Sequence, residues 1–149
     1  MVFPSGEIEG KYEESEYYSM PERSIGGMSN AQLNYFTDVL KKYPNVKWTF
    51  VLMHKPLWMR EDEKGLGPLE DALADRDYTV INGHFHSFSN RIRKGHSYTM
   101  LGTTGGSQNP KDSMAFDHVT LVRMAKQPVI THLKMEGILN EQGTVPSGQ

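Results

Sequence analysis

Histidines stand directly after two stretches of the sequence that are expected to be buried strands. VKWTFVLM, residues 46–53, is an apolar run of β-branched and aromatic residues, and His54 follows it. YTVIN, residues 78–82, is a second strand-like run, and GHFH, residues 83–86, follows it. Three neutral imidazoles can bind zinc, iron or manganese. The candidate metal ligands are therefore His54, His84 and His86.

A strand–helix–strand unit would bring these histidines together. PLEDALADR, residues 68–76, begins with proline and carries leucines on one face, which predicts a short helix between the two strands. A unit of this length allows the strands to be parallel neighbours with a right-handed connection. Their carboxyl ends would then lie at one edge of the sheet, where ligands bind in open α/β sheets. Gly83 is expected to make the sharp bend there, because it lacks a Cβ atom.

Signals elsewhere in the chain predict one further helix and two hairpins. Ser29 and Gln32 form a capping box ahead of an amphipathic helix over residues 30–43, which Pro44 ends. Residues 88–101 are expected to form a hairpin that turns near Lys94-Gly95. A glycine-rich loop and a second hairpin follow, at residues 101–110 and 116–136.

The order helix, strand, helix, strand and antiparallel meander predicts an α/β, or more broadly α+β, fold. One domain is expected over residues 29–139, after an irregular segment at 1–28 and before a polar tail at 140–149. The formal charge of −2 over 149 residues gives no reason to expect a nucleic-acid partner. No cysteine is present and no apolar run approaches the roughly 20 residues of a membrane span, so disulfides, thiolate sites and membrane spanning are not expected. The compartment stays open.

A less specific interpretation of the histidines stays open as well. Two exposed loop histidines would also produce an H-x-H pair, and several unrelated metal folds contain one. An amidohydrolase barrel needs a longer chain, and the metallo-β-lactamase pattern needs an aspartate and a histidine where this sequence has SFSN.

The remaining aromatic and basic residues are expected to be structural or solvated. Trp48 is predicted to be in the core, and Trp58 to line a pocket or cover a loop. RIRK, residues 91–94, is expected to be a solvated face. His96 is expected in a solvated turn, and structural or surface roles are predicted for His118 and His132.

Two ordered blocks resemble the calcineurin-like metallophosphoesterases, in particular a bacterial branch. VLMHKPLW at residues 51–58 is similar to the V-x-x-H-x-P block, and NGHFH at residues 82–86 to the G-H-x-H block. The helix SNAQLNYF and the TGG step at 104–106 are similar too, so that the resemblance spans roughly residues 26–137. It implies an α/β/β/α sandwich that hydrolyses phosphate mono- or diesters at a dinuclear metal site. His54 and His84 would bind one ion and His86 the other.

The sequence also departs from this family. The family's D-x-H, G-D and G-N-H-D/E blocks, which supply the bridging carboxylate, an asparagine ligand and a further histidine, do not occur here. The chain thus resembles only the C-terminal half of such an enzyme, and its expected partners are the missing N-terminal half and a small phosphoester substrate. Without those carboxylates we expect at most one weakly bound divalent ion (zinc, manganese or iron) and negligible phosphatase activity.

Two alternatives stay open beside this prediction. The chain could be a non-catalytic truncated pseudoenzyme that serves as a binding module, or a protein that binds a single metal ion through three histidines. A half-domain would also expose one face of a sheet, which favours association.

Overall fold

The structure, a computed structural model, describes residues 26–62 and 64–135. In chain order its elements are α3 (Asn30–Lys42), β1 (Thr49–Leu52), the 3-10 helix η1 (Leu57–Met59), α4 (Gly67–Ala72), β2 (Tyr78–Asn82), β3 (Ser89–Arg93), β4 (His96–Met100), β5 (His118–Met124) and β6 (Pro128–Lys134). The predictions for residues 1–25 and 140–149 lie outside the described residues. Two sheets and a few helices make this an α+β fold, as the sequence predicted.

Helix α3 begins and ends close to where the sequence predicted. Ser29 is the N-cap, and its hydroxyl accepts the Gln32 N–H while the Gln32 side chain accepts the Ser29 N–H, which completes the capping box. The helix ends at Lys42, and its apolar face buries Phe36 and Leu40. Burial of this face holds α3 in the same hydrophobic core as the sheet.

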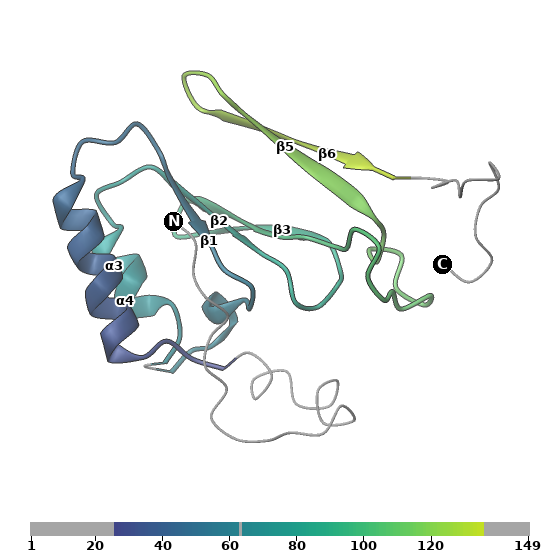
Figure 1. The fold of residues 1–149 in the computed structure, drawn as a ribbon, viewed down its shortest axis with the longest axis horizontal. Helices are drawn as coiled ribbons and strands as arrows, with labels where there is room; N and C mark the ends of the chain where they lie inside the picture. The colour runs from purple at the N-terminus through teal and green to yellow at the C-terminus, as the bar shows by residue number, and fades with distance from the viewer. Residues whose placement is uncertain (1–25, 63, 136–149) are drawn as a thin grey trace.

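The main sheet has the strand order β1-β2-β4-β3 (Figure 1). Strands β1 and β2 are parallel neighbours, with Val51 opposite Val80, so the predicted strand–helix–strand pairing is confirmed. The predicted meander is wrong in one respect, because β4 and not β3 pairs with β2, in parallel. The reason is burial: β4 carries the buried Tyr98 and Thr99, whereas the polar strand β3 is mostly exposed and takes the edge.

Helices and hairpin occupy different sides of this sheet. In Figure 1, α3 and α4 lie to the left of the sheet, and the β5–β6 hairpin lies to its upper right. The core between helices and sheet is closely packed, and Val51, Val80, Leu69, Leu73 and Tyr98 have essentially no exposed surface. This packing fixes the ends of β1 and β2 relative to each other.

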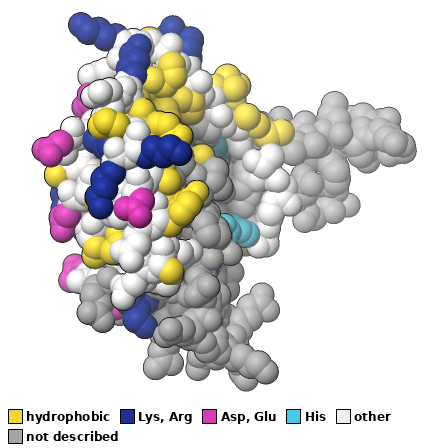
Figure 2. Space-filling view, turned by 60° about the vertical axis from the view of Figure 1, so that its left-hand side comes forward, with side chains coloured by type: hydrophobic (Ala, Val, Ile, Leu, Met, Phe, Trp, Pro, Cys, Tyr) yellow, Lys and Arg dark blue, Asp and Glu magenta, His cyan; other side chains and the backbone are white. Residues whose placement is uncertain are grey.

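The β5–β6 hairpin carries an exposed apolar face. Alternation along the two strands puts four residues on the same face, each 42–52% exposed: Val119, Leu121, Val129 and Leu133. Hydrophobic side chains (yellow) also reach the surface on the side shown in Figure 2, where basic (dark blue) and acidic (magenta) side chains lie among them. The hairpin thus has an exposed apolar face, while the expectation that a missing half-domain exposes a sheet face stays a prediction.

Two predictions about large or basic side chains are wrong. Trp48 is only half-buried, because β1 begins at Thr49, and its Nε1–H donates to the Thr79 hydroxyl over 3.1 Å. The basic run at residues 91–94 is not simply a solvated face, because Arg93 and Lys94 both bind the buried carboxylate of Glu70.

Within residues 26–62 and 64–135, no helix has the length and apolar character needed to cross a membrane.

Candidate metal centre

His54 and His84 lie side by side at the carboxyl edge of β1 and β2. The ladder between these strands continues past their ends: Met53 N–H donates to the Ile81 carbonyl over 3.1 Å, and Gly83 N–H to the His54 carbonyl over 3.0 Å. His54 Nε2 and His84 Nδ1 are 3.3 Å apart, and the two rings meet edge to face. The prediction that the strand ends bring these two imidazoles together is confirmed.

This separation suits a shared metal ion. Two imidazole nitrogens bound at about 2.05 Å to one tetrahedral zinc ion lie about 3.3 Å apart, the distance between these two atoms. Partial burial lowers the pKa of His54, and the positive charges of Lys55 and His86 lower it further. The lowered pKa favours the neutral imidazole, which is the form that binds metals.

The bend that aims the histidines is made by the histidines themselves. His84 and His86 have φ angles of 83° and 54°, in the left-handed region that residues with a Cβ atom rarely adopt. The prediction that Gly83 makes this bend is wrong, because its φ is not positive and a Cβ atom there would meet open space. Positive φ angles at two candidate ligands, two residues apart, are of the kind found at functional sites.

The side chain of Asn82 forms two hydrogen bonds that hold the backbone ahead of the bend. Asn82 is buried at the end of β2, where its Oδ1 accepts the indole N–H of Trp58 over 3.0 Å. Its Nδ2 donates to the Gly83 carbonyl over 2.9 Å. Trp58 is therefore a core residue, 7% exposed, that holds the backbone between strand and histidines.

His86 is held separately by the glycine-rich loop. Its Nδ1 lies 2.7 Å from the Ser107 carbonyl oxygen, and the ring is half-buried. Across the described ranges, 26–62 and 64–135, no three His, Cys, Asp or Glu side chains form a group that could hold a metal ion. The structure thus brings two of the three predicted ligands together and puts the third on a separate support.

Asp117 organises the loop that contacts His86, and sequence reasoning missed this role. Its Oδ1 accepts the Thr103 hydroxyl and, over 2.8 Å, the Gly105 N–H. These hydrogen bonds lower the pKa of Asp117, so the carboxylate is ionised at neutral pH. An isolated β-bridge joins Thr103 to Asp117 in the structure. No periodic pattern in the sequence predicts that these two residues meet.

The other described histidines, His96, His118 and His132, pack against aromatic rings away from the candidate site. His118 is buried, and His118 and His132 pack edge to face with each other and with Phe88. Burial and the nearby His118 lower the pKa of His132. His96 was expected in a solvated turn, but β4 begins there, and the half-buried ring stacks on Tyr78 with centroids 3.7 Å apart.

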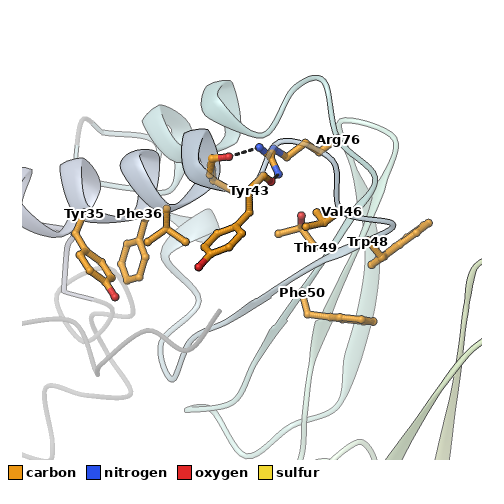
Figure 3. Close-up of a pocket in the computed structure, with 10 residues that line it drawn as sticks. Tyr35, Phe36, Tyr43, Val46, Trp48, Thr49, Phe50 and Arg76 are labelled. Carbon is orange, nitrogen blue, oxygen red and sulfur yellow. Dashed lines mark hydrogen bonds between the residues drawn. The ribbon is translucent and has the colours of Figure 1, made fainter.

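A separate pocket of about 470 Å³ lies between α3 and β1 (Figure 3). Aromatic side chains line much of it, among them Tyr35, Tyr43 and Phe50. Arg76 closes one end, where its guanidinium donates to the Tyr43 carbonyl over 2.8 Å. None of the candidate metal ligands lines this pocket, so it is not part of the histidine site.

No known family model matches this chain, and no curated protein matches it significantly.

Proposed function

We propose that this chain is the C-terminal portion of a metal-dependent phosphohydrolase that acts on phosphate mono- or diesters through a dinuclear metal site. The observation that carries the proposal is the 3.3 Å approach of His54 Nε2 and His84 Nδ1 at the common edge of two parallel strands. The resemblance of the two histidine blocks to the calcineurin-like metallophosphoesterases supports it. The small-molecule substrate would be a phosphoester.

Each of the three histidines has a separate role in this proposal. His54 and His84 together would hold one divalent ion (zinc, manganese or iron), and His86 would contribute to a second. Bound metal ions would supply a hydroxide nucleophile and neutralise charge on the phosphoryl oxygens. The buried strands β1 and β2 and the Trp58–Asn82 contact would keep the imidazoles in place.

The donor set of the chain fits one ion better than two. Zinc, manganese and iron dications held close together require negative ligands, and no carboxylate joins the histidine pair within the described ranges. We therefore propose that an N-terminal half supplies the bridging carboxylate. By itself the chain binds at most one ion, weakly, and has negligible turnover.

Zinc binding to the full 149-residue chain tests this proposal. We expect one zinc ion per chain by calorimetry, and at least a tenfold loss of affinity in His54→Ala and in His84→Ala, because each change removes one of two nitrogens. His96→Ala is the matched control, since this ring stacks on Tyr78 far from the pair, and should bind like the parent chain.

Three outcomes would contradict the proposal. Equal zinc affinity in His54→Ala and the parent chain would exclude the pair as a site. Two tightly held ions per chain would contradict the requirement for a second half. Turnover of a chromogenic phosphoester that His84→Ala abolishes would show that the chain is active by itself.

A non-catalytic binding module is the second candidate function. The four exposed apolar residues on one face of the β5–β6 hairpin favour it, because exposed apolar surface is typical of interaction sites. Zinc binding that depends on His54 distinguishes the two candidates, since a binding module has no need of the pair.

A further inference from the structure

The hydrogen bond of His86 determines which of its two ring nitrogens carries the proton. Nδ1 lies 2.7 Å from the Ser107 carbonyl oxygen, which can only accept, and 3.3 Å from the Ser107 hydroxyl, which can donate or accept. Because the carbonyl contact is the shorter one, we assign the hydrogen to Nδ1, so that in the neutral ring Nε2 keeps its lone pair. Neutral imidazole in water prefers the opposite tautomer, so the Ser107 carbonyl imposes this one.

The position of the Ser107 carbonyl is fixed by the two glycines that precede it, Gly105 and Gly106. Gly105 has a φ of 82°, a conformation that favours glycine. At Gly106 a Cβ atom would lie 3.2 Å from the Thr103 side chain, a tight contact, and 3.5 Å from Cε1 of His86, an ordinary van der Waals contact, so the loop lies against both groups. Thr103 also accepts a hydrogen bond from the Gln108 side chain over 3.2 Å, which closes the loop on itself.

Asp117 is the charged group that holds this loop to β5. Its carboxylate accepts both the Thr103 hydroxyl and the Gly105 N–H, two residues on the way to Ser107. The Thr103 N–H and carbonyl add backbone bonds to Phe116 and His118 on either side of Asp117. The loop is therefore anchored to β5 at residues 103–105, and the part that follows, from Gly106 onward, contacts His86.

We propose that Asp117 is a positioning residue for His86: by anchoring residues 103–105 it holds the Ser107 carbonyl against Nδ1, so that His86 presents Nε2 as its ligating atom. The significance of this nitrogen rests on the proposed metal-dependent function. The tautomer itself is a property of the metal-free chain. His54, His84 and His86 would then offer Nε2, Nδ1 and Nε2, respectively.

Nitrogen NMR of the neutral imidazoles tests this inference in the metal-free full chain. Long-range ¹H–¹⁵N correlation above pH 8 should show Nδ1 of His86 as the protonated nitrogen. In Asp117→Ala we expect a loss of this tautomer in favour of the Nε2–H form, because the loop no longer holds Ser107 in place. Asp117→Asn, which keeps one acceptor oxygen, should restore part of the parent population.

Two further variants keep the test decisive. Thr103→Val removes one of the two loop contacts and should shift the tautomer in the same direction, even if Asp117→Ala does not fold. Asp75 is an exposed carboxylate between α4 and the amino end of β2, so Asp75→Ala should leave the His86 tautomer unchanged. The inference is overturned if the parent chain shows Nε2–H at His86, or if neither Asp117→Ala nor Thr103→Val changes the tautomer.

The failure of this inference and the failure of the proposed function give different results. A tautomer that shifts as expected in a chain whose zinc affinity does not depend on His54 supports the positioning role and refutes the metal site. If zinc binding depends on His54 but the His86 tautomer is the same in Asp117→Ala as in the parent chain, only the positioning role is refuted.

Discussion

His84 must satisfy two requirements that conflict at one residue. Its ring contacts His54 at the candidate site, while its backbone has a φ of 83° that a side chain makes unfavourable. The ring contact and the backbone turn therefore make opposing demands on this residue. Under the proposed function, the ring of His84 has a role that a glycine could not serve.

Replacing His84 by two small residues separates the strain from the chemistry. Both His84→Gly and His84→Ala remove the ring, but only glycine relaxes the positive φ. The left-handed φ costs alanine about 1–2 kcal/mol, and the entropy of the unfolded chain costs glycine about 0.5–1 kcal/mol. We therefore expect urea unfolding to show His84→Gly more stable than His84→Ala by a net difference of about 0.5–1 kcal/mol. His96 supplies the control pair, because its backbone is in β4, where alanine should be the more stable of the two. Equal stability of the two His84 variants would argue against strain.

At the scale of elements, the carboxylate of Glu70 joins α4 to the β3–β4 hairpin. The buried carboxylate accepts hydrogen bonds from Arg93 Nε over 2.7 Å, Lys94 Nζ over 3.0 Å and Tyr98 Oη over 2.7 Å. Burial by itself would raise the pKa of Glu70, but the hydrogen bonds from Arg93, Tyr98 and Lys94 outweigh it, and the pKa is lowered. The ion pairs lie at the opposite end of the sheet from His54.

The lowered pKa of Glu70 makes part of the stability dependent on acid pH. Because the pKa is lower in the folded chain, the contribution is complete above the unfolded pKa and is lost as pH falls through the folded pKa. We expect Glu70→Gln to cost about 2 kcal/mol at pH 7 and to flatten the fall in unfolding free energy on the acid side. Urea unfolding at several pH values measures both, with the exposed Glu61→Gln as control. An unchanged acid slope in Glu70→Gln would contradict the prediction.

Elements with local signals could be predicted from the sequence, and strand order could not. The Ser29–Gln32 capping box located α3, and Lys94-Gly95, both with positive φ, located the hairpin turn. The position of β4 beside β2 depends on Tyr98, whose hydroxyl needs Glu70 and Tyr78 as partners. Those contacts join residues at least 20 positions apart, and no local period encodes them.

In the candidate site too, features with local sequence signals could be predicted, and features that depend on tertiary contacts could not. His54 and His84 could be paired in advance because each follows a recognisable strand, and parallel strands bring their ends together. Asp117 could not be assigned a role, because it acts through an irregular loop whose path depends on tertiary contacts. The bend was assigned to Gly83 because glycine is the usual residue there, whereas the structure puts it at His84.

For the whole molecule, we expect the exposed face of the β5–β6 hairpin to govern association in solution. Its four apolar residues, Val119, Leu121, Val129 and Leu133, are each 42–52% exposed. We expect the chain to self-associate at micromolar concentrations, and Leu121→Lys with Leu133→Lys to shift sedimentation towards monomer. Gln127→Lys, which adds charge at the exposed turn, should not have this effect. A parent chain that sediments as a clean monomer at all concentrations contradicts the expectation.

The parallel pairing of β2 with β4 has a consequence for the order of folding. Strands β3 and β4 are joined by a two-residue turn and can close within about 1–10 μs, as isolated hairpins do. Ser97 of β4 pairs with Thr79 of β2, 18 residues earlier in the chain, and all of β3 lies in the connection, so this parallel pairing is less local than the hairpin. We therefore expect the local hairpin to form before the non-local pairing, and the His84–His86 segment, which links β2 to β3, to acquire its positive φ angles at that later step.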